Sequence, residues 1–495
     1  PEVLNYRKHV MTKTYSFLLL AFCFSFFHSS AQIKNTSFEN TPHSTFDSLN
    51  WEAETKPNYS FFVDSNEFHS GKNSLKITST ALNKYNNFCP FNQSVKVNFT
   101  GLKKIALSVF IKTNSVTTNV GLWCQIWGKD NQIGFENLEM QYTRISGTNE
   151  WKKYSLILLV DTSVKTLVFG GYLQGNGTVW YDDFEIENLI YKNEKPSFRI
   201  RNFRKKMVTI IKKNSIYSDS LDWAKIDNAL NELTRGLKNV NESYLLVNYM
   251  QSQLRVIGDN HSFFASDIQL KKMQECTNCI KPSGKMIDSN IAYLSINGFI
   301  PKNKKNELNY AIHIQNLIKS LDSNYNIKYW IIDLRENWGG DMYPMIAGLA
   351  PIIGEGTYGY FVLPKKEPEE WYYKKGKCGE EKNQVLKVKH SYTLKNDSIK
   401  IAVLIGGNTA SSGEATAISF IGKKNVKTFG NPSGGYTTGN EDYKLPNDYW
   451  MALATCWFSD RNGKLYLHNI EPDVILEKGI TEEKIFSTVQ KWFNE

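Results

Sequence analysis

Short stretches in which apolar and polar residues alternate dominate the chain between residues 32 and 187. Clusters of glycine, asparagine and serine, which favour turns, separate these stretches at close intervals. The clearest stretches are Ser74 to Ile77, Ile105 to Ile111, Val120 to Trp127, Tyr154 to Val160 and Thr166 to Tyr172. Many short strands of this kind are typical of a β-sandwich. We therefore predict an all-β domain over residues 32–187.

The spacing of apolar residues changes to three and four residues after position 188, which indicates amphipathic helices. One such helix is predicted near Leu221 to Leu233, behind a cap at Ser220 or Asp222. A second helix is predicted to end at Gly258. The positive run from Arg199 to Lys206 is interpreted as the solvated face of another helix. We predict a small helical unit over residues 188–266.

Buried strands and helices alternate in the remainder of the chain. The predicted strands are Ile291 to Ile296, Tyr329 to Leu334, Ile401 to Ile405 and Val426 to Phe429, and a helix is predicted from Leu308 to Leu321. This alternation predicts an α/β domain, which we place at residues 267–495. The segment from Lys365 to Lys395, rich in charged and aromatic residues, interrupts the order and is interpreted as a lid, a specificity insertion or a surface excursion.

The chain has 495 residues, enough for two or three domains, and it contains a signal-peptide pattern near its start. Lys13 supplies positive charge, Phe17 to Phe27 is apolar, and small residues end at Ala31, so residues 1–31 are interpreted as leader and signal peptide. The apolar run is too short to span a membrane, and no cysteine follows the cleavage site to carry a lipid. We predict a secreted or periplasmic protein without a transmembrane segment after signal cleavage.

The formal net charge of +10 comes from lysines scattered along the chain, which indicates a solvated surface with at most weak attraction to anionic partners. A nucleic acid partner is not expected for an exported protein. Of the 7 cysteines, Cys23 leaves with the signal peptide, and Cys276 and Cys279 form the one close pair. Without a second pair at zinc-finger spacing, a local disulfide or two free thiols are expected in place of a metal site.

The stretch from Ile401 to Phe420, IAVLIGGNTASSGEATAISF, combines a buried strand, a glycine turn and the start of a helix. Asn408 or Thr409 can cap this helix, and Ser411 is predicted to lie in its first turn. Unpaired N–H groups and the positive end of the helix dipole gather there, which would stabilise an oxyanion. Taken alone, the stretch is equally typical of a helix start that is rich in small residues.

A second stretch, DLRENWGGD from Asp333 to Asp341, changes this interpretation. Together with NTASSGE it resembles the paired signature of the C-terminal-processing and tricorn-core serine peptidases, the family of tail-specific proteases. GNPSGGYTTG from Gly430 and NIEPDVIL from Asn469 resemble the next blocks of that family in the same order. The resemblance implies a crotonase-like α/β core of ββα units and the activity of a serine endopeptidase. Its substrate would be a polypeptide.

The resemblance assigns the nucleophile to Ser411, with Ser412 as the neighbour if the alignment is off by one residue. Gly258 to Phe263, GDNHSF, resembles the block that holds the general base, which makes His261 the candidate base. Relatives with a lysine base carry it where this chain has Asn431, so the histidine branch is favoured. The residues between this block and the core are too few for a PDZ domain. If the histidine failed as a base, Lys423, Lys424 and Lys427 would be tested first.

The remaining roles in the site are implied less completely. Ser412 and either Gly339 or Gly340 are the candidates whose backbone N–H groups bind the oxyanion. Asp333, Arg335 and Glu414 are expected to support the turns that carry the site. The residue that orients His261 stays open between Glu471, Asp473 and a residue that is not acidic.

The ends of the first domain, Asn35 to Glu39 and Trp180 to Ile186, resemble the edge strands of jelly-roll carbohydrate-binding modules with a galactose-binding-like fold. In such domains carboxylates near these ends hold a structural calcium, for which Glu39 and Asp183 are candidates against the alternative of plain surface acids. Alternation places Trp123, Gln125 and Trp127 on one strand face. That face is either a sugar-stacking platform or, as we expect for large aromatics, part of the core.

These observations predict an exported serine endopeptidase without a catalytic metal or other cofactor, whose jelly-roll module docks it to a glycan or a protein. The alternative is a peptide- or glycan-binding protein on a peptidase scaffold that lacks activity. A glycoside hydrolase would need paired carboxylates across a cleft, and no such pair stands out. With an ordinary histidine pKa of about 6.5, activity should fall as the pH drops through roughly 6 to 7.

Overall fold

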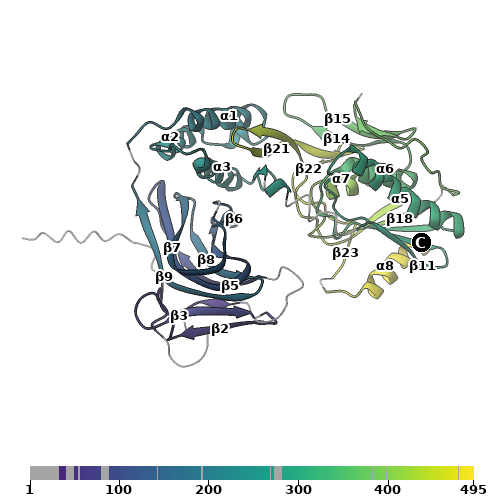
Figure 1. Ribbon diagram of the computed structural model, residues 1–495. Coiled ribbons are helices and arrows are strands. Elements are labelled where there is room, and N and C mark those ends of the chain that lie inside the picture. Colours follow the sequence, from purple (N-terminus) through teal and green to yellow (C-terminus); the bar gives the residue numbers. More distant parts are fainter. Residues whose placement is uncertain are drawn as a thin grey trace, which may run out of the picture.

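The computed structural model describes residues 33–40, 50–53, 56–79, 88–141, 143–190, 193–267, 269–271, 281–381, 383–396, 399–477 and 479–495. The predicted signal peptide and the pair Cys276 and Cys279 lie outside these residues. Among the described residues, no helix is long and apolar enough to cross a bilayer. Figure 1 shows the predicted fold class: a β-sandwich, a group of helices above it, and an α/β lobe beside both.

The described residues of the sandwich form nine strands. They are β1 (Glu52–Ala53), β2 (Tyr59–Asp64), β3 (Ser74–Ser79), β4 (Phe88–Lys96), β5 (Lys103–Trp127), β6 (Gln132–Asn137), β7 (Ile145–Val160), β8 (Thr166–Gln174) and β9 (Gly177–Leu189). The two strands predicted at Ile105 to Ile111 and Val120 to Trp127 are one long strand, β5. Its first half pairs with β7 and β9, and its second half pairs with β8 and β6. β5 therefore holds the two layers of the sandwich together.

The expectation that Trp123 and Trp127 pack into the core is wrong. Cys124 and Ile126, on the opposite face of β5, are buried in the sandwich core, whereas Trp123, Gln125 and Trp127 are half-buried on the outer face. The indole N–H of Trp123 donates to the carbonyl of Gly171 (3.2 Å), so its polar group is satisfied in this position. The alternating pattern assigned these residues to the two faces of the strand correctly. The expectation that the larger residues are buried, however, predicted the wrong face as the inner one.

The candidate calcium ligands bind parts of the protein. Glu39 Oε1 accepts from the backbone N–H groups of Lys72 (2.8 Å) and Asn73 (3.0 Å). Asp183 Oδ2 lies 2.6 Å from His69 Nδ1, and its other oxygen accepts from two serine hydroxyls. The described residues contain no group of three or more side chains arranged for a metal ion. Glu39 and Asp183 instead bind the same loop, from His69 to Asn73, and the structural calcium stays a prediction.

The helical unit comprises α1 (Phe198–Asn214), η2 (Ser218–Ser220), α2 (Trp223–Thr234), η3 (Val240–Ser243) and α3 (Tyr244–Val256). Ser197 and Asp222 cap α1 and α2 with their side-chain oxygens. The apolar faces of these helices form one buried cluster that also contains Leu159 of the sandwich and Leu453 of the α/β lobe. The helical unit therefore packs against both neighbours.

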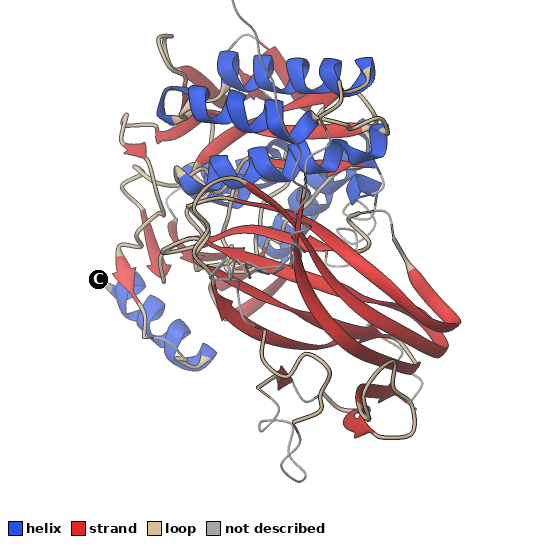
Figure 2. Ribbon diagram, turned by 90° about the vertical axis from the view of Figure 1, so that its left-hand side faces the viewer, coloured by secondary structure: helices blue, strands red, loops and turns tan. Residues whose placement is uncertain are grey.

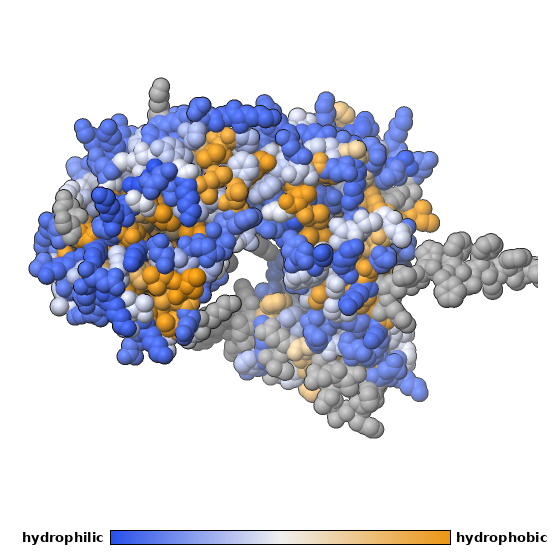
Figure 3. Space-filling view, turned by 180° about the vertical axis from the view of Figure 1, so that it is seen from behind, coloured by the Kyte–Doolittle hydropathy of each residue, from blue (hydrophilic) through white to orange (hydrophobic). Residues whose placement is uncertain are grey.

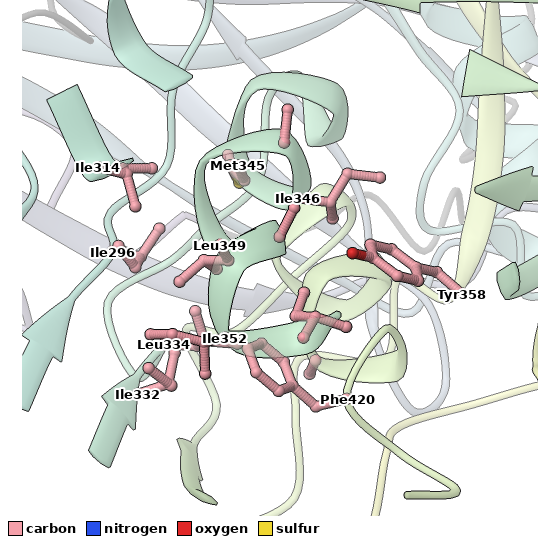
Figure 4. Packing of buried hydrophobic residues seen from close by; sticks show 14 of the residues in the cluster. Ile296, Ile314, Ile332, Leu334, Met345, Ile346, Leu349, Ile352, Tyr358 and Phe420 are labelled. Carbon is pink, nitrogen blue, oxygen red and sulfur yellow. The ribbon is translucent and has the colours of Figure 1, made fainter. Parts of the chain in front are cut away.

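The α/β lobe is built on a sheet in the order β11-β12-β13-β18-β19-β23. Its strands are β11 (Ser283–Asp288), β12 (Ile291–Ser295), β13 (Tyr329–Asp333), β18 (Lys400–Ile405), β19 (Val426–Gly430) and β23 (Val474–Ile475), and its helices are α5 (Lys304–Asn324), α6 (Met342–Ile353), α7 (Ser412–Ile418) and α8 (Glu482–Asn494). The strands from β12 to β23 are parallel, whereas β11 is antiparallel to β12. Figure 4 shows Met345 and Leu349 of α6 among buried isoleucines and Phe420. The predicted strands and helices of this lobe are confirmed.

A second, antiparallel sheet covers the first. It consists of β10 (Phe263–Ser266), β14 (Gly356–Val362), β15 (Glu369–Lys374), β16 (Lys377–Glu380), β17 (Asn383–Lys387), β20 (Thr438–Leu445), β21 (Tyr449–Asp460) and β22 (Leu465–Tyr466). The segment from Lys365 to Lys395 supplies β15 to β17, and its Trp371, Tyr373 and Cys378 are buried in the core of the lobe. The interpretations of this segment as a lid or a surface excursion are therefore wrong, because it is an integral part of a sheet.

The sandwich and the α/β lobe are joined mainly at one end of the molecule. Figure 2 shows the long curved strands of the sandwich extending away from the helices, and Figure 3 shows an open hollow between the two lobes. Leu159 of β7 faces the helices, whereas Leu158 and Val160 beside it face the sandwich core. Strand β7 is therefore buried on both faces where it meets the helical unit.

Candidate active site

Ser411 lies directly after the loop that follows β18 and caps α7, which begins at Ser412. The sequence predicts Ser411 inside the first turn of the helix, whereas it precedes that turn by one position. Its backbone has φ +54° and ψ −120°, a conformation that residues with a side chain rarely adopt. Neither Asn408 nor Thr409 caps the helix, since Thr409 donates its hydroxyl to the carbonyl of Leu334 (2.8 Å). A sharp strained turn therefore presents the Ser411 hydroxyl.

Glu414 holds this turn from below. Its side chain is fully buried, and its Oε2 accepts the backbone N–H of Ser411 (2.9 Å). Its Oε1 accepts the hydroxyl of Ser433 and the backbone N–H of Gly435 (2.9 Å). Burial raises the pKa of Glu414 to about 7, although these hydrogen bonds favour the ionised form. The carboxylate thus connects the turn that carries Ser411 to the loop after β19.

His261 lies beside Ser411, although the two residues come from distant parts of the chain. Its Nε2 lies 2.9 Å from Ser411 Oγ, although the two residues are 150 positions apart. The buried Asp259 holds the loop before β10 by accepting the backbone N–H groups of His261 (3.2 Å) and Ser262 (2.9 Å). Burial lowers the pKa of His261 to about 4, because it disfavours the charged imidazolium. The imidazole is therefore neutral at pH 7 and able to accept a proton.

Thr438 is the partner of the other imidazole nitrogen, with its Oγ1 2.7 Å from His261 Nδ1. When Nε2 accepts the Ser411 hydroxyl, Nδ1 carries the proton and donates it to this oxygen. Both acidic candidates lie elsewhere: Glu471 accepts from Asn469, and Asp473 accepts from the backbone and hydroxyl of Thr428. The residue that faces Nδ1 is therefore not acidic, which was the third alternative.

Thr438 was missed by sequence reasoning although it lies inside a quoted block, GNPSGGYTTG. Orienting acids were sought because they are the usual partners of a catalytic histidine. Thr438 opens β20, whose pairing with β21 fixes it near β10 and hence near His261. That proximity depends on sheet pairing between distant segments, which no local pattern reveals.

The turn from Asn337 to Gly340, which we call the glycine turn, lies against Ser411. Asn337 Oδ1 accepts the N–H of Gly339 (3.1 Å), so this N–H is occupied. Within the described part of the chain, the N–H groups of Gly340 and Ser412 donate to no other group. Of the two glycines considered, Gly340 is thus the one with an available N–H. A Cβ on Gly339 would come within 2.9 Å of Ser411 Cβ and 3.1 Å of Ser412 N.

Hydrogen bonds join the glycine turn to the turn that carries Ser411. The N–H of Ala410 donates to the carbonyl of Asn337 (3.0 Å), and the hydroxyl of Ser412 donates to the carbonyl of Gly340 (2.7 Å). Gly413 packs so closely that an added Cβ would lie 2.1 Å from the Asn337 carbonyl oxygen. The hydroxyl of Ser412 is therefore bound to the glycine turn, while that of Ser411 faces His261.

Arg335 and Asp333, which precede the glycine turn, form an ion pair. Arg335 binds Asp333 with two of its nitrogens and reaches Glu482 at the start of α8 (2.6 Å). The alternative bases lie elsewhere, since Lys423 donates to the carbonyl of Ile353 and Lys427 lies over the ring of Trp492 (5.7 Å). Lys424 is exposed.

Two partly exposed aromatic side chains flank the pair formed by Ser411 and His261. The ring of Tyr436 stands edge-on to His261 with centroids 5.5 Å apart. The indole of Trp338, beside the glycine turn, is 43% exposed and covers Gly298, where a Cβ would lie 2.5 Å from the indole. Tyr436 therefore lies beside the histidine and Trp338 beside the glycine turn.

A family model described as Peptidase family S41 matches residues 290–476 of this chain. The nisin-resistance protein of Lactococcus lactis subsp. lactis is 31% identical over 260 residues, which cover 52% of this chain and 78% of that protein. The solved structure of a lipoprotein from Streptococcus agalactiae covers 60% of this chain and 97% of its own, with a TM-score of 0.50 and 27% identity. The solved structure of the photosystem II D1 C-terminal processing protease covers 59% of this chain and 97% of its own, with a TM-score of 0.43 and 10% identity.

The family model matches a segment that lies within the α/β lobe and contains Ser411 and the glycine turn, whereas His261 precedes that segment. This chain belongs to peptidase family S41 and is a serine-type peptidase.

Proposed function

We propose that this protein is an exported serine endopeptidase in which Ser411 is the nucleophile and His261 the general base. The contact of 2.9 Å between His261 Nε2 and Ser411 Oγ carries this proposal. A serine hydroxyl attacks a peptide carbonyl only when a base takes its proton, and a neutral imidazole within hydrogen-bond reach is suited to that task. The strained turn that presents Ser411 also supports the assignment, because such strain gathers at functional sites.

The reaction follows from these positions. As Ser411 Oγ bonds to the scissile carbonyl carbon, its proton passes to His261 Nε2, and the carbonyl oxygen becomes an oxyanion facing the N–H groups of Gly340 and Ser412. Collapse of this intermediate breaks the C–N bond, and the imidazolium gives its proton to the leaving amine. Water, deprotonated by His261, then releases the acyl group and restores the Ser411 hydroxyl. The proton of Ser411 thus leaves on the amine, and a proton from water, passed through His261, restores the hydroxyl.

Thr438 would keep the imidazole in the required tautomer by accepting its Nδ1–H. Thr438→Val removes this acceptor with little change of shape, whereas Thr438→Ser keeps it. We expect kcat to fall about tenfold or more in the valine variant and to be largely retained in the serine variant, because only the former leaves Nδ1–H unpaired. Retained kcat in the valine variant together with a loss in the serine variant would show that the methyl group, and not the hydroxyl, matters.

Export is supported by the signal-peptide pattern of residues 1–31, and a polypeptide substrate is supported by the family. We also propose the divisions 32–187, 188–266 and 267–495, which the separate hydrophobic clusters support. The alternative of a binding protein without activity is less favoured. Ser411 and His261 lie within hydrogen-bond distance, and the N–H groups of Gly340 and Ser412 are available to bind an oxyanion.

One observation favours a second role for the sandwich in glycan binding. Trp123 and Phe135 stack on its outer face with centroids 6.4 Å apart, and both are accessible in part. Glycan-array binding of the wild type beside Trp123→Ala and Trp127→Ala would test this role, because flat aromatic faces bind sugar rings through the C–H groups. Signals that persist in both variants would exclude this face.

The proposed mechanism is tested by cleavage of a denatured protein and by labelling with a fluorophosphonate, which reacts with an activated serine. We expect Ser411→Ala to lose both, and His261→Ala to lose activity by a factor on the order of 10³ or more. Ser412→Ala is the matched control, and it should keep labelling because its hydroxyl faces Gly340. Wild-type activity in Ser411→Ala would refute the assignment, and loss confined to Ser412→Ala would transfer it to that residue.

A further inference from the structure

The outer face of α1 carries an unusual concentration of positive charge. Residues spaced three and four apart place one set of side chains away from the molecule, and the exposed members of this set include Arg199, Arg201, Lys205, Lys206, Lys212 and Lys213. The opposite side of the helix, with Phe203, Met207 and Ile211, is buried in the helical cluster. We call the exposed set the cationic face. Figure 1 shows α1 at the upper edge of the molecule, which Figure 3 shows lined mainly by hydrophilic side chains.

Most of this charge has no acidic partner. Asp227 of α2 pairs with Lys212 (3.0 Å) and lies 3.9 Å from Arg204. Among the described residues no carboxylate forms an ion pair with Arg199, Lys205, Lys206 or Lys213. Ordinary solvated helices alternate charges of both signs, which lowers repulsion along the face. The cationic face does not, so it carries a repulsion that an anionic surface would relieve.

One large apolar side chain lies within the cationic face: Phe198, in the first turn of α1, is 73% exposed. Phe198 shares the helical face of Arg201 and Lys205, since it precedes them by three and seven positions. Single exposed apolar residues are common, but an aromatic ring within a field of unpaired cations is the pattern of helices that lie on membranes.

We propose that the cationic face of α1 binds the surface of a membrane that contains anionic lipids, with Phe198 entering the interface. Each Lys or Arg held near such a surface adds to the attraction, so several together suffice for reversible attachment. A membrane suits this face better than an acidic peptide, because the cations spread along the whole 17-residue helix without a groove between them. This inference does not depend on the catalytic chemistry.

The test uses the chain without residues 1–31, so that the signal sequence cannot contribute. Sedimentation with vesicles of phosphatidylglycerol and phosphatidylcholine in equal parts, at low salt, should bring down the protein, whereas pure phosphatidylcholine should not. Lys205→Glu together with Lys206→Glu should weaken binding at least about tenfold, and so should high salt, because the attraction is electrostatic. Phe198→Ser should weaken it by a smaller factor.

Matched controls lie on other faces. Lys302→Glu with Lys305→Glu, at exposed positions near the start of α5, makes the same change of net charge and should leave binding unchanged. Phe62→Ser removes a phenylalanine on the sandwich that is 51% exposed. Absence of vesicle binding by the wild type, or equal losses in the two lysine pairs, would overturn the proposal. Binding to poly-aspartate without binding to vesicles would likewise overturn it, in favour of an acidic polypeptide.

Discussion

His261 shows how the surroundings of one side chain change a prediction. From the ordinary pKa of histidine, activity should fall between roughly pH 6 and 7. Burial lowers the pKa to about 4, so the folded protein keeps the base neutral well below that range. The sign is that of a depressed histidine: the active neutral form is present above pH 4 and is lost as the pH falls through it.

We therefore expect the final loss of kcat/KM to be centred near pH 4, measured on a short peptide across a pH range in which circular dichroism shows the fold intact. The earlier expectation of pH 6 to 7 for this residue is corrected accordingly. A single complete loss centred near 6.5 would mean that His261 is hydrated in solution.

Gly339 offers a second test at this scale. Its φ of +107° and the 3.1 Å separation between an added Cβ and Ser412 N mean that alanine would crowd the space in front of that N–H. We expect Gly339→Ala to lower kcat by a factor on the order of 10² to 10³, as loss of an oxyanion donor does, with a smaller change in KM.

The matched control is Gly463→Ala, which also has a positive φ (+85°) but open space around it. It carries the backbone strain of alanine without crowding the site. Comparable losses of kcat in both variants would show that strain alone explains the result at Gly339.

Sequence reasoning reached Ser411, His261 and the glycine turn because their motifs are contiguous and their chemistry constrains residue type. It did not choose between Gly339 and Gly340, since that choice depends on the Asn337 side chain taking one of the two N–H groups. It also missed Thr438, whose contact with His261 spans 177 positions.

At the scale of elements, Glu414 joins α7 to the loop after β19. Because burial raises its pKa from 4.5 to about 7, the folded state favours the protonated carboxyl, so stability falls as the pH rises from about 4.5 to 7 and the full penalty is present above 7. The ionised carboxylate of Glu414 nevertheless restrains the backbone of Ser411. We interpret its unfavourable burial as a cost in stability that maintains the geometry of the site.

Glu414→Gln should lower kcat about tenfold or more at pH 8, because the amide group cannot accept N–H groups on both sides. The melting temperature at pH 8 should be unchanged or higher, since a buried charge is removed. In the wild type a partial loss of kcat near pH 7 should precede the loss near pH 4, and only this first step should vanish in the variant.

Asp322→Asn is the matched control for Glu414→Gln. Asp322 is also a buried carboxylate that accepts a hydroxyl (2.9 Å) and a backbone N–H (2.8 Å), but it lies between α5 and Lys395, away from Ser411. Its variant should keep the wild-type pH profile. If the partial loss of kcat near pH 7 disappeared in both variants, it could not be assigned to Glu414.

Among the elements, periodicity predicted the strands and helices of the α/β lobe and failed where residues serve two purposes. The charged and aromatic segment that contains Trp371 and Tyr373 was interpreted as a lid or an excursion because its charges face solvent, yet alternate side chains are buried. The polar residues between Ile111 and Val120 were interpreted as a break, whereas β5 continues through them with bulges.

At the scale of the molecule, β7 connects the sandwich to the helical unit. Leu159 belongs to the helical cluster, and Asp161 beyond it pairs with Lys225 of α2 (2.8 Å). We expect the sandwich and the α/β lobe to unfold in a single calorimetric transition, since both share this cluster.

Leu159→Ser should lower the free energy of unfolding by about 2 to 4 kcal/mol. The sandwich should then unfold in a transition of its own, separate from that of the rest of the protein. The measurement is differential scanning calorimetry, with Leu467→Ser as control because Leu467 is 53% exposed. Two transitions already present in the wild type would show that the shared cluster does not couple the lobes.

The distance along the chain between His261 and Ser411 also determines when the enzyme can first act. His261 is synthesised long before Ser411, and its loop is held by β10, which pairs with Tyr449 to Ala452 of β21. Thr438 likewise arrives after Ser411. A nascent chain therefore has no assembled site until nearly all of the α/β lobe has left the ribosome.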